Sequence, residues 1–241
     1  MTLPTPLNCL NGTNGVSYCG LDPSSVVSSG YWGSWKSSAA RKNKTMPGGT
    51  ILVFTCSNGD YIANTALGPE FMVLNCWGQS IRHLGQLFND PAIAAMCQRA
   101  GAIVLYGFLQ NWIDQEYAQG RSETQVLGSS GNVPYILQGV ANWLTGKGVI
   151  VEATPVRDAN LPTGSYCTNA RMDSINNYVH SIFGNKTGWE VAEVNATLKG
   201  GGSELATTYY DAAEHPHVND VALTNVIIPE IKSKLVGLGV L

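Results

Sequence analysis

A serine lies far in this 241-residue sequence from an aspartate and a histidine with which it could cleave an ester. Ser57 comes shortly after the apolar run Thr50-Ile-Leu-Val-Phe54, while Asp211 and His215 precede the last apolar segment of the chain. A serine hydroxyl becomes a nucleophile when an imidazole accepts its proton and a carboxylate orients that imidazole. We therefore expect Ser57 to be the nucleophile, His215 the base and Asp211 the orienting carboxylate.

Two alternatives stay open around the base. His217 could replace His215, with Glu214 as its partner, but Pro216 directly after His215 favours His215 as a rigidly placed base. Glu214 is adjacent to His215, and neighbouring side chains usually diverge, so Asp211 is the expected partner. His215 and His217 also resemble a metal pair, but no third ligand stands out. We therefore expect no metal and no cofactor, and interpret His180 and His83 as surface or packing residues.

Donors for an oxyanion hole follow two further apolar runs. Gly78 ends the segment Asn75-Cys-Trp-Gly78 after the run 71–74, and Asn111 follows the run 102–106. With the backbone N–H of Ser57, they form the expected oxyanion hole. Trp77 and Trp112 stand beside these donors, and aromatic faces stack well on sugar rings, so both are expected to bind substrate.

These groups need strands that end at one edge of a sheet. Five apolar runs predict strands, at residues 50–54, 71–74, 102–106, 148–153 and 189–194. Helices are expected between and after them, at residues 80–88, 91–99, 133–145, 173–183 and 220–236. This alternation predicts an α/β fold, a three-layer α/β/α sandwich with a mainly parallel sheet. Ligands of such sheets bind outside the carboxyl ends of the strands.

The blocks that carry the chemistry resemble, in their order, those of the SGNH/GDSL hydrolases. Ser57 corresponds to the serine of the family's Gly-Asp-Ser block, although Thr55 and Cys56 replace the first two residues. The segment 75–78 matches the Asn-x-x-Gly block well, and Asn111 is the one residue kept from Gly-x-Asn-Asp. The resemblance spans about residues 50–236 and implies a flavodoxin-like sheet.

The fourth block of the family, Asp-x-x-His, corresponds to Asp211 and His215 with one additional residue between them. The resemblance implies a serine esterase that forms an acyl-serine intermediate. Its members cleave lipid esters, thioesters and O-acetyl groups of sugars, and some are parts of phage tails. Since the tryptophans favour sugars, we expect a polysaccharide or small-molecule ester substrate, most simply an O-acetyl ester on carbohydrate. The alternative is a non-catalytic, carbohydrate-binding module of a larger surface or virion protein.

Composition limits the remaining possibilities. Charged residues make up 13% of the chain and its formal charge is −3, which argues against a nucleic-acid partner. No apolar stretch suits membrane insertion, no signal peptide is visible, and the hydroxyl-rich composition favours an extracellular or virion-associated protein.

Residues 1–48, rich in Pro, Gly, Ser and Asn, are expected to form an arm or small cap on a hydrolase domain at 49–241. Cys9 and Cys19 could form a disulfide in an oxidising compartment, Cys56 and Cys76 are interpreted as small buried residues, and the oligomeric state stays open.

Overall fold

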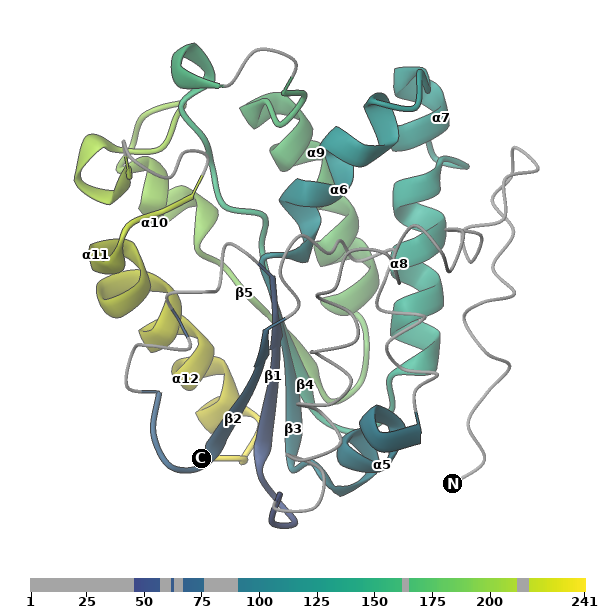
Figure 1. The fold of residues 1–241 in the computed structure, drawn as a ribbon, viewed down its shortest axis with the longest axis vertical. Helices are drawn as coiled ribbons and strands as arrows, with labels where there is room; N and C mark the ends of the chain where they lie inside the picture. Colours follow the sequence, from purple (N-terminus) through teal and green to yellow (C-terminus); the bar gives the residue numbers. More distant parts are fainter. Residues whose placement is uncertain (1–45, 57–61, 63–66, 76–90, 162–164, 212–216) are drawn as a thin grey trace.

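The computed structural model describes residues 46–56, 62, 67–75, 91–161, 165–211 and 217–241. Within these ranges, one five-stranded sheet lies between two layers of helices (Figure 1). The predicted three-layer α/β/α sandwich is therefore confirmed. Only residues 46–48 of the expected N-terminal arm are described, so its separation from the main domain stays a prediction. No helix in the described part of the chain is long and apolar enough to cross a membrane.

All neighbouring strands of the sheet are parallel, in the order β2-β1-β3-β4-β5. Their bounds are β1 Ile51–Thr55, β2 Phe71–Asn75, β3 Ala102–Tyr106, β4 Gly148–Val151 and β5 Trp189–Ala192. This is the flavodoxin-like order, in which the direction of winding reverses between β1 and β3. The position outside the carboxyl ends of β1 and β3 is therefore where a ligand crevice is expected.

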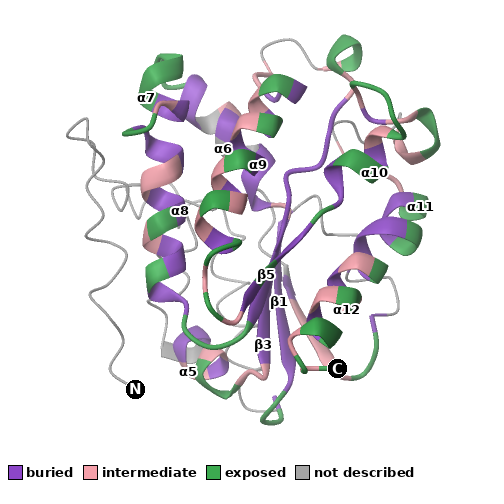
Figure 2. Ribbon diagram, turned by 180° about the vertical axis from the view of Figure 1, so that it is seen from behind, coloured by how far each residue is buried: buried purple, intermediate pink, exposed green. Residues whose placement is uncertain are grey.

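Alternate strand residues face two separate cores, because side chains of a strand point to opposite faces. Leu52 and Phe54 join one core with the helices α5 Pro91–Arg99, α6 Phe108–Tyr117, α7 Glu123–Leu127, α8 Asn132–Trp143 and α9 Asn169–Phe183. Ile51 and Val53 join the other with α10 Asn195–Lys199, α11 Asp220–Ala222 and α12 Ile228–Gly237. Figure 2 shows the strands buried between these layers. The two cores hold the strands from both faces, so the carboxyl ends of the strands have fixed positions.

Some helices differ from those that the sequence predicts. The expected helix at 80–88 lies outside the described residues, whereas α6 was not expected at all. Gly107 precedes α6 with φ 82°, and no side chain caps the helix, so the usual start signal is missing. The last helix is present, but the π-helical turn Leu223–Ile227 interrupts it. The chain therefore enters α6 directly from β3, through a left-handed glycine.

The far end of α6 is held by a buried carboxylate. Glu116 is fully buried, and its Oε2 accepts hydrogen bonds from Arg121 Nη1 at 2.7 Å and from Asn132 Nδ2 of α8 at 2.8 Å. Breaking a buried ion pair leaves an uncompensated charge inside the protein. We therefore expect Arg121→Ala to lower the free energy of unfolding by about 3–5 kcal/mol, measured by urea denaturation. Arg99→Ala, at an exposed arginine, should cost less than about 1 kcal/mol. Equal losses in the two variants would contradict this role of Glu116.

Candidate functional site

The ends of β1 and β3 lie side by side at the point where the strand order reverses. Thr55 pairs with Tyr106 in the parallel ladder. Beyond the strands, the buried Cys56 donates a hydrogen bond through its thiol to the carbonyl oxygen of Gly107, with Sγ and O 2.6 Å apart. The thiol thus joins the two strand ends. Ser57 is the next residue in sequence and lies outside the described residues, as do Trp77 and Gly78.

The first turn of α6, which contains Asn111, is anchored by buried side chains. Gln110 is 1% exposed, and its Nε2 donates to the carbonyl oxygen of Thr154, 2.9 Å away, and to the hydroxyl of the same residue. From the other side, Cys167 Sγ donates to the carbonyl oxygen of Gln110 at 3.1 Å. The backbone that carries Asn111 is therefore fixed to the segments after β4 and before α9. The side chains of Asn111 and Trp112 lie outside the described residues.

The two hydrogen bonds of Gln110 give a testable contribution to stability. Methionine fills a similar volume but cannot donate, so Gln110→Met would leave the buried Thr154 carbonyl without this donor. We expect a loss of about 1–3 kcal/mol in the free energy of unfolding. The matched control is Gln138→Met, at an exposed position of α8, which should change the free energy by less than about 0.5 kcal/mol. A Gln110→Met variant as stable as the control would show that Thr154 does not anchor α6.

Two buried side chains near this edge of the sheet, Cys167 and Tyr106, stay protonated. Burial raises the pKa of the Cys167 thiol, and the nearby Asp114 carboxylate raises it further, so the thiol stays protonated and can donate. Burial likewise raises the pKa of the Tyr106 phenol, whose hydroxyl makes no hydrogen bond to the described residues. The expectation that Cys56 is a small buried residue is confirmed, whereas the anchoring roles of Gln110 and Cys167 were not expected.

The loop that contains His215 is closed at its base. An antiparallel bridge between Tyr210 and Val218 joins its two ends. Asn219 then ties this base to α11, because its N–H donates to the carbonyl oxygen of Tyr209 at 3.0 Å and its Oδ1 accepts from the N–H of Ala222 at 3.1 Å. The loop therefore begins and ends at fixed positions.

Of the loop's predicted catalytic groups, Asp211 and the alternative base His217 are described, and both are half-buried near the bridge. His215 and Glu214 lie outside the described residues. The sequence alternatives for the base and for its orienting carboxylate therefore stay predictions.

This loop lies at the carboxyl edge of the sheet. Lys147 directly precedes β4, and its Nζ donates to the carbonyl oxygen of Leu238, after α12, at 2.6 Å. Since α12 ends at the amino edge of the strands, the helical segment that precedes it starts at the carboxyl edge, as Figure 1 shows for α11. Arg157, which follows β4, also contacts the segment before the loop. Its Nη1 donates to Thr207 Oγ1 at 3.1 Å.

The structure thus brings three predicted segments to one edge: the end of β1, the first turn of α6 and the base of the 211–217 loop. The contact between Ser57 and His215 and the positions of the oxyanion donors stay predictions. Within the described ranges, no three His, Cys, Asp or Glu side chains form a group that could hold a metal ion.

Sequence reasoning missed a second polar cluster, at the ends of β4 and β5. His180 was expected to be a surface or packing residue, and its side chain is 40% exposed. Its Nε2 also lies 2.8 Å from Oε1 of Glu152. Glu152 directly follows β4, and Glu193 directly follows β5. An acidic residue just after each of two buried runs is a signal in the sequence that could have identified this cluster.

Comparisons with known proteins agree with the fold. No family model and no curated protein sequence matches the chain. Among solved structures, a Streptococcus pneumonia protein with a provisional assignment as a platelet activating factor matches with a TM-score of 0.60 and 16% identity, over 84% of this chain and 91% of that chain. A Bacteroides fragilis protein with a provisional assignment as an acylhydrolase matches with a TM-score of 0.58 and 15% identity, over 84% of this chain and 95% of that chain. At these identities, the similarity shows a shared fold.

Proposed function

We propose that this chain is a serine esterase whose catalytic centre lies outside the carboxyl ends of β1 and β3. The observation that carries the proposal is the strand order, which reverses where β1 ends two residues before Ser57. The first turn of α6 and the base of the His215 loop lie at the same edge. A solved structure with the same fold has a provisional assignment as an acylhydrolase, which supports ester cleavage.

In the proposed reaction, Ser57 Oγ attacks the ester carbonyl while His215 accepts the hydroxyl proton. Asp211 orients the ring through its other nitrogen. The oxyanion receives hydrogen bonds from the backbone N–H groups of Ser57 and Gly78 and from the Asn111 side chain. His215 then protonates the leaving alcohol, and an acyl-serine remains. Water, deprotonated by His215, attacks this acyl group and releases the acid and free Ser57.

The anchored start of α6 supports the part assigned to Asn111. Donors of an oxyanion hole are effective when they are held in place before the reaction begins. Cys56, Gln110 and Cys167 restrain the backbone that directly precedes Asn111 through buried hydrogen bonds. Cys56 stands where the SGNH/GDSL pattern has aspartate, and its thiol joins the ends of β1 and β3 instead. The ends of β1 and β3 are therefore connected although a cysteine stands in place of the aspartate.

We further propose that the substrate is an O-acetyl ester on a carbohydrate and that the protein acts outside the cell or on a virion. Trp77 and Trp112, next in sequence to two oxyanion donors, offer aromatic faces on which a sugar ring can stack. The low fraction of charged residues, 13%, suits a hydroxyl-rich partner. In the alternative, a carbohydrate-binding module, the same aromatic faces would bind a glycan without cleaving it.

An ester assay tests the proposal and separates it from the alternative. The purified chain should hydrolyse p-nitrophenyl acetate with saturation kinetics, above the rate of the heat-denatured protein. It should also release acetate from acetylated xylan, because the acyl acceptor is expected to be a sugar. Binding to the polysaccharide without acetate release, together with no turnover of p-nitrophenyl acetate, would identify a binding module and contradict the esterase.

A further inference from the structure

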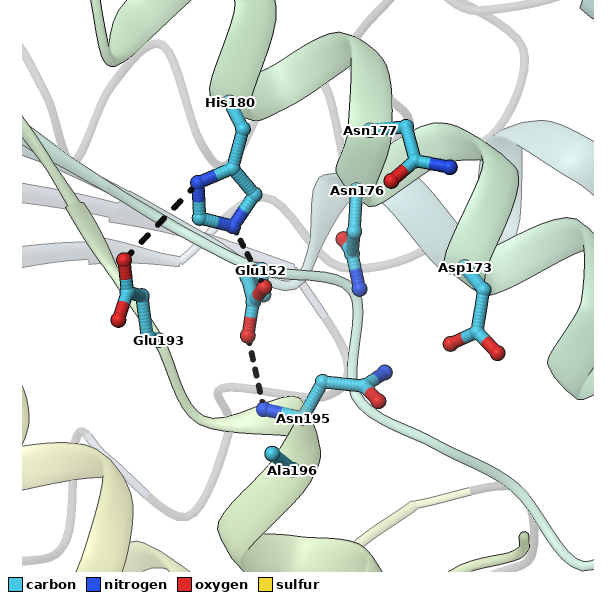
Figure 3. A pocket seen from close by; sticks show the side chains of 8 residues that line it. All are labelled: Glu152, Asp173, Asn176, Asn177, His180, Glu193, Asn195 and Ala196. Atoms are coloured by element: carbon cyan, nitrogen blue, oxygen red, sulfur yellow. Dashed lines mark hydrogen bonds and ion pairs between the residues drawn. The ribbon is translucent and has the colours of Figure 1, made fainter.

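A polar pocket lies beyond the carboxyl ends of β4 and β5, between α9 and α10 (Figure 3). Its volume is about 360 Å³, within the range of roughly 300–1,000 Å³ that is typical of small-molecule sites. Adjacent strands are about 4.8 Å apart. The pocket therefore lies two strand spacings, roughly 10 Å, along the sheet from the junction of β1 and β3. It is a separate place from the proposed catalytic centre.

The floor of the pocket is held by buried hydrogen bonds. The side chain of Glu152 is 9% exposed, its Oε1 lies 2.8 Å from His180 Nε2, and its Oε2 accepts from the N–H of Asn195 at 2.8 Å. Both Asn176 and Asn195 donate through their side chains to the carbonyl oxygen of Ala153 at 3.1 Å. This floor joins β4, α9 and α10, so the groups above it are held in place.

The wall and rim present several hydrogen-bonding groups to solvent. Glu193 has a side chain that is 60% exposed, and Asn177 is exposed on α9. Asp173 lies on the same helix, one turn before Asn177. The amide of Asn177 both donates and accepts, whereas the two carboxylates accept only. The pocket thus offers hydrogen-bond donors and acceptors from two different segments, α9 and the residues after β5.

Each carboxylate of the pocket faces a basic side chain. Glu152 and Glu193 flank the ring of His180, with Glu193 Oε1 4.0 Å from His180 Nδ1. Asp173 forms an ion pair with Lys199, whose Nζ lies 2.7 Å from Oδ1 of Asp173. Lys199 offsets the charge of Asp173 alone, and His180 carries a charge only when it is protonated. Ala196 is the one apolar residue in the lining. A ligand with many hydroxyl groups suits such a lining, because each hydroxyl can donate to a carboxylate or accept from an amide.

We propose that this pocket binds one neutral sugar ring, through hydrogen bonds to Asn177, Glu193 and Asp173. A sugar hydroxyl both donates and accepts, so vicinal hydroxyls can donate to a carboxylate and accept from an amide at the same time. The proposal does not rest on the proposed esterase activity, because none of these residues belongs to that centre. It gives the protein a carbohydrate contact that is separate from the junction of β1 and β3.

Solution NMR tests the pocket with glucose, galactose, mannose and N-acetylglucosamine as probes. We expect at least one sugar to cause saturable shifts of the Asn177 and Asn195 signals at concentrations up to about 100 mM, a range that covers millimolar affinities. Asn177→Ala and Glu193→Ala should each weaken binding by about tenfold, the loss expected for one hydrogen bond to a polar or charged group. Asn142→Ala, at an exposed asparagine of α8, is the matched control and should leave the affinity unchanged.

Putrescine and the Ser57→Ala variant complete the test. Saturable shifts of the pocket signals with putrescine but with none of the sugars would overturn the proposal, because the site would then bind cations. The absence of shifts with all four sugars would overturn it as well. Ser57→Ala should keep full sugar binding at the pocket whether or not the esterase proposal holds. A failure of the esterase assay would therefore leave this result intact.

Discussion

Replacing Ser57 by alanine is expected to lower kcat for p-nitrophenyl acetate by a factor of about 10⁴ or more. Alanine has no hydroxyl, so no acyl-serine can form, and the remaining rate comes from the oxyanion donors and substrate binding alone. Alanine keeps the backbone N–H and C=O of residue 57, and strand hydrogen bonds join backbone groups, so the substitution removes no strand hydrogen bond. The fold should therefore persist, with an unchanged thermal midpoint.

The matched control for this variant is Ser181→Ala, because Ser181 is exposed on α9, away from the junction of β1 and β3 where the strand order reverses. It should keep the full activity. Activity within about tenfold of the parent in Ser57→Ala would exclude Ser57 as the nucleophile, since nucleophile losses are far larger.

Asp211→Asn is expected to lower kcat by up to about 10⁴, the loss seen when a triad aspartate becomes an amide. The amide cannot hold the imidazole in the tautomer that accepts the serine proton. The chain can bring Asp211 to His215 despite the additional residue, because Ala212 and Ala213 have small side chains. The base of the loop is closed by the bridge between Tyr210 and Val218, so the backbone of the variant should stay in place.

Glu214→Gln is the matched control for Asp211→Asn, since it makes the same chemical change three residues later. It should keep near-normal turnover, and kcat and KM of both variants should be measured across a range of pH. Near-normal turnover in Asp211→Asn with a collapse in Glu214→Gln would reverse the assignment. Near-normal turnover in both would mean that a backbone carbonyl or a water molecule orients His215.

The sheet could be predicted from the sequence because its strands are short and apolar. The run at 102–106 matches β3 at both ends, since buried parallel strands read as continuous apolar segments. Helix α6 could not be predicted in the same way. Its start has no capping side chain, and the chain turns into it at Gly107, whose left-handed conformation is set by the strand before and the helix after. The local signal for a helix start was therefore absent.

Sequence order could place the strand ends that precede the proposed catalytic groups, whereas it could not predict the long-range contacts that support these strand ends. Cys56 contacts Gly107 across 51 residues, and Gln110 contacts Thr154 across 44. Such contacts arise only when strands β1, β3 and β4 have paired, so no local pattern reveals them. The pocket around His180 depends on the same kind of contact, between α9 and the ends of β4 and β5.

Covalent labelling shows directly whether Ser57 is the nucleophile. The protein is incubated with diisopropyl fluorophosphate, and the labelled peptide is identified by mass spectrometry beside the His215→Ala and Ser181→Ala variants. We expect one adduct, on Ser57, formed with loss of esterase activity, much slower in His215→Ala and unchanged in Ser181→Ala. A protein that hydrolyses esters while Ser57 stays unlabelled, or that carries the adduct on another serine, would contradict the account.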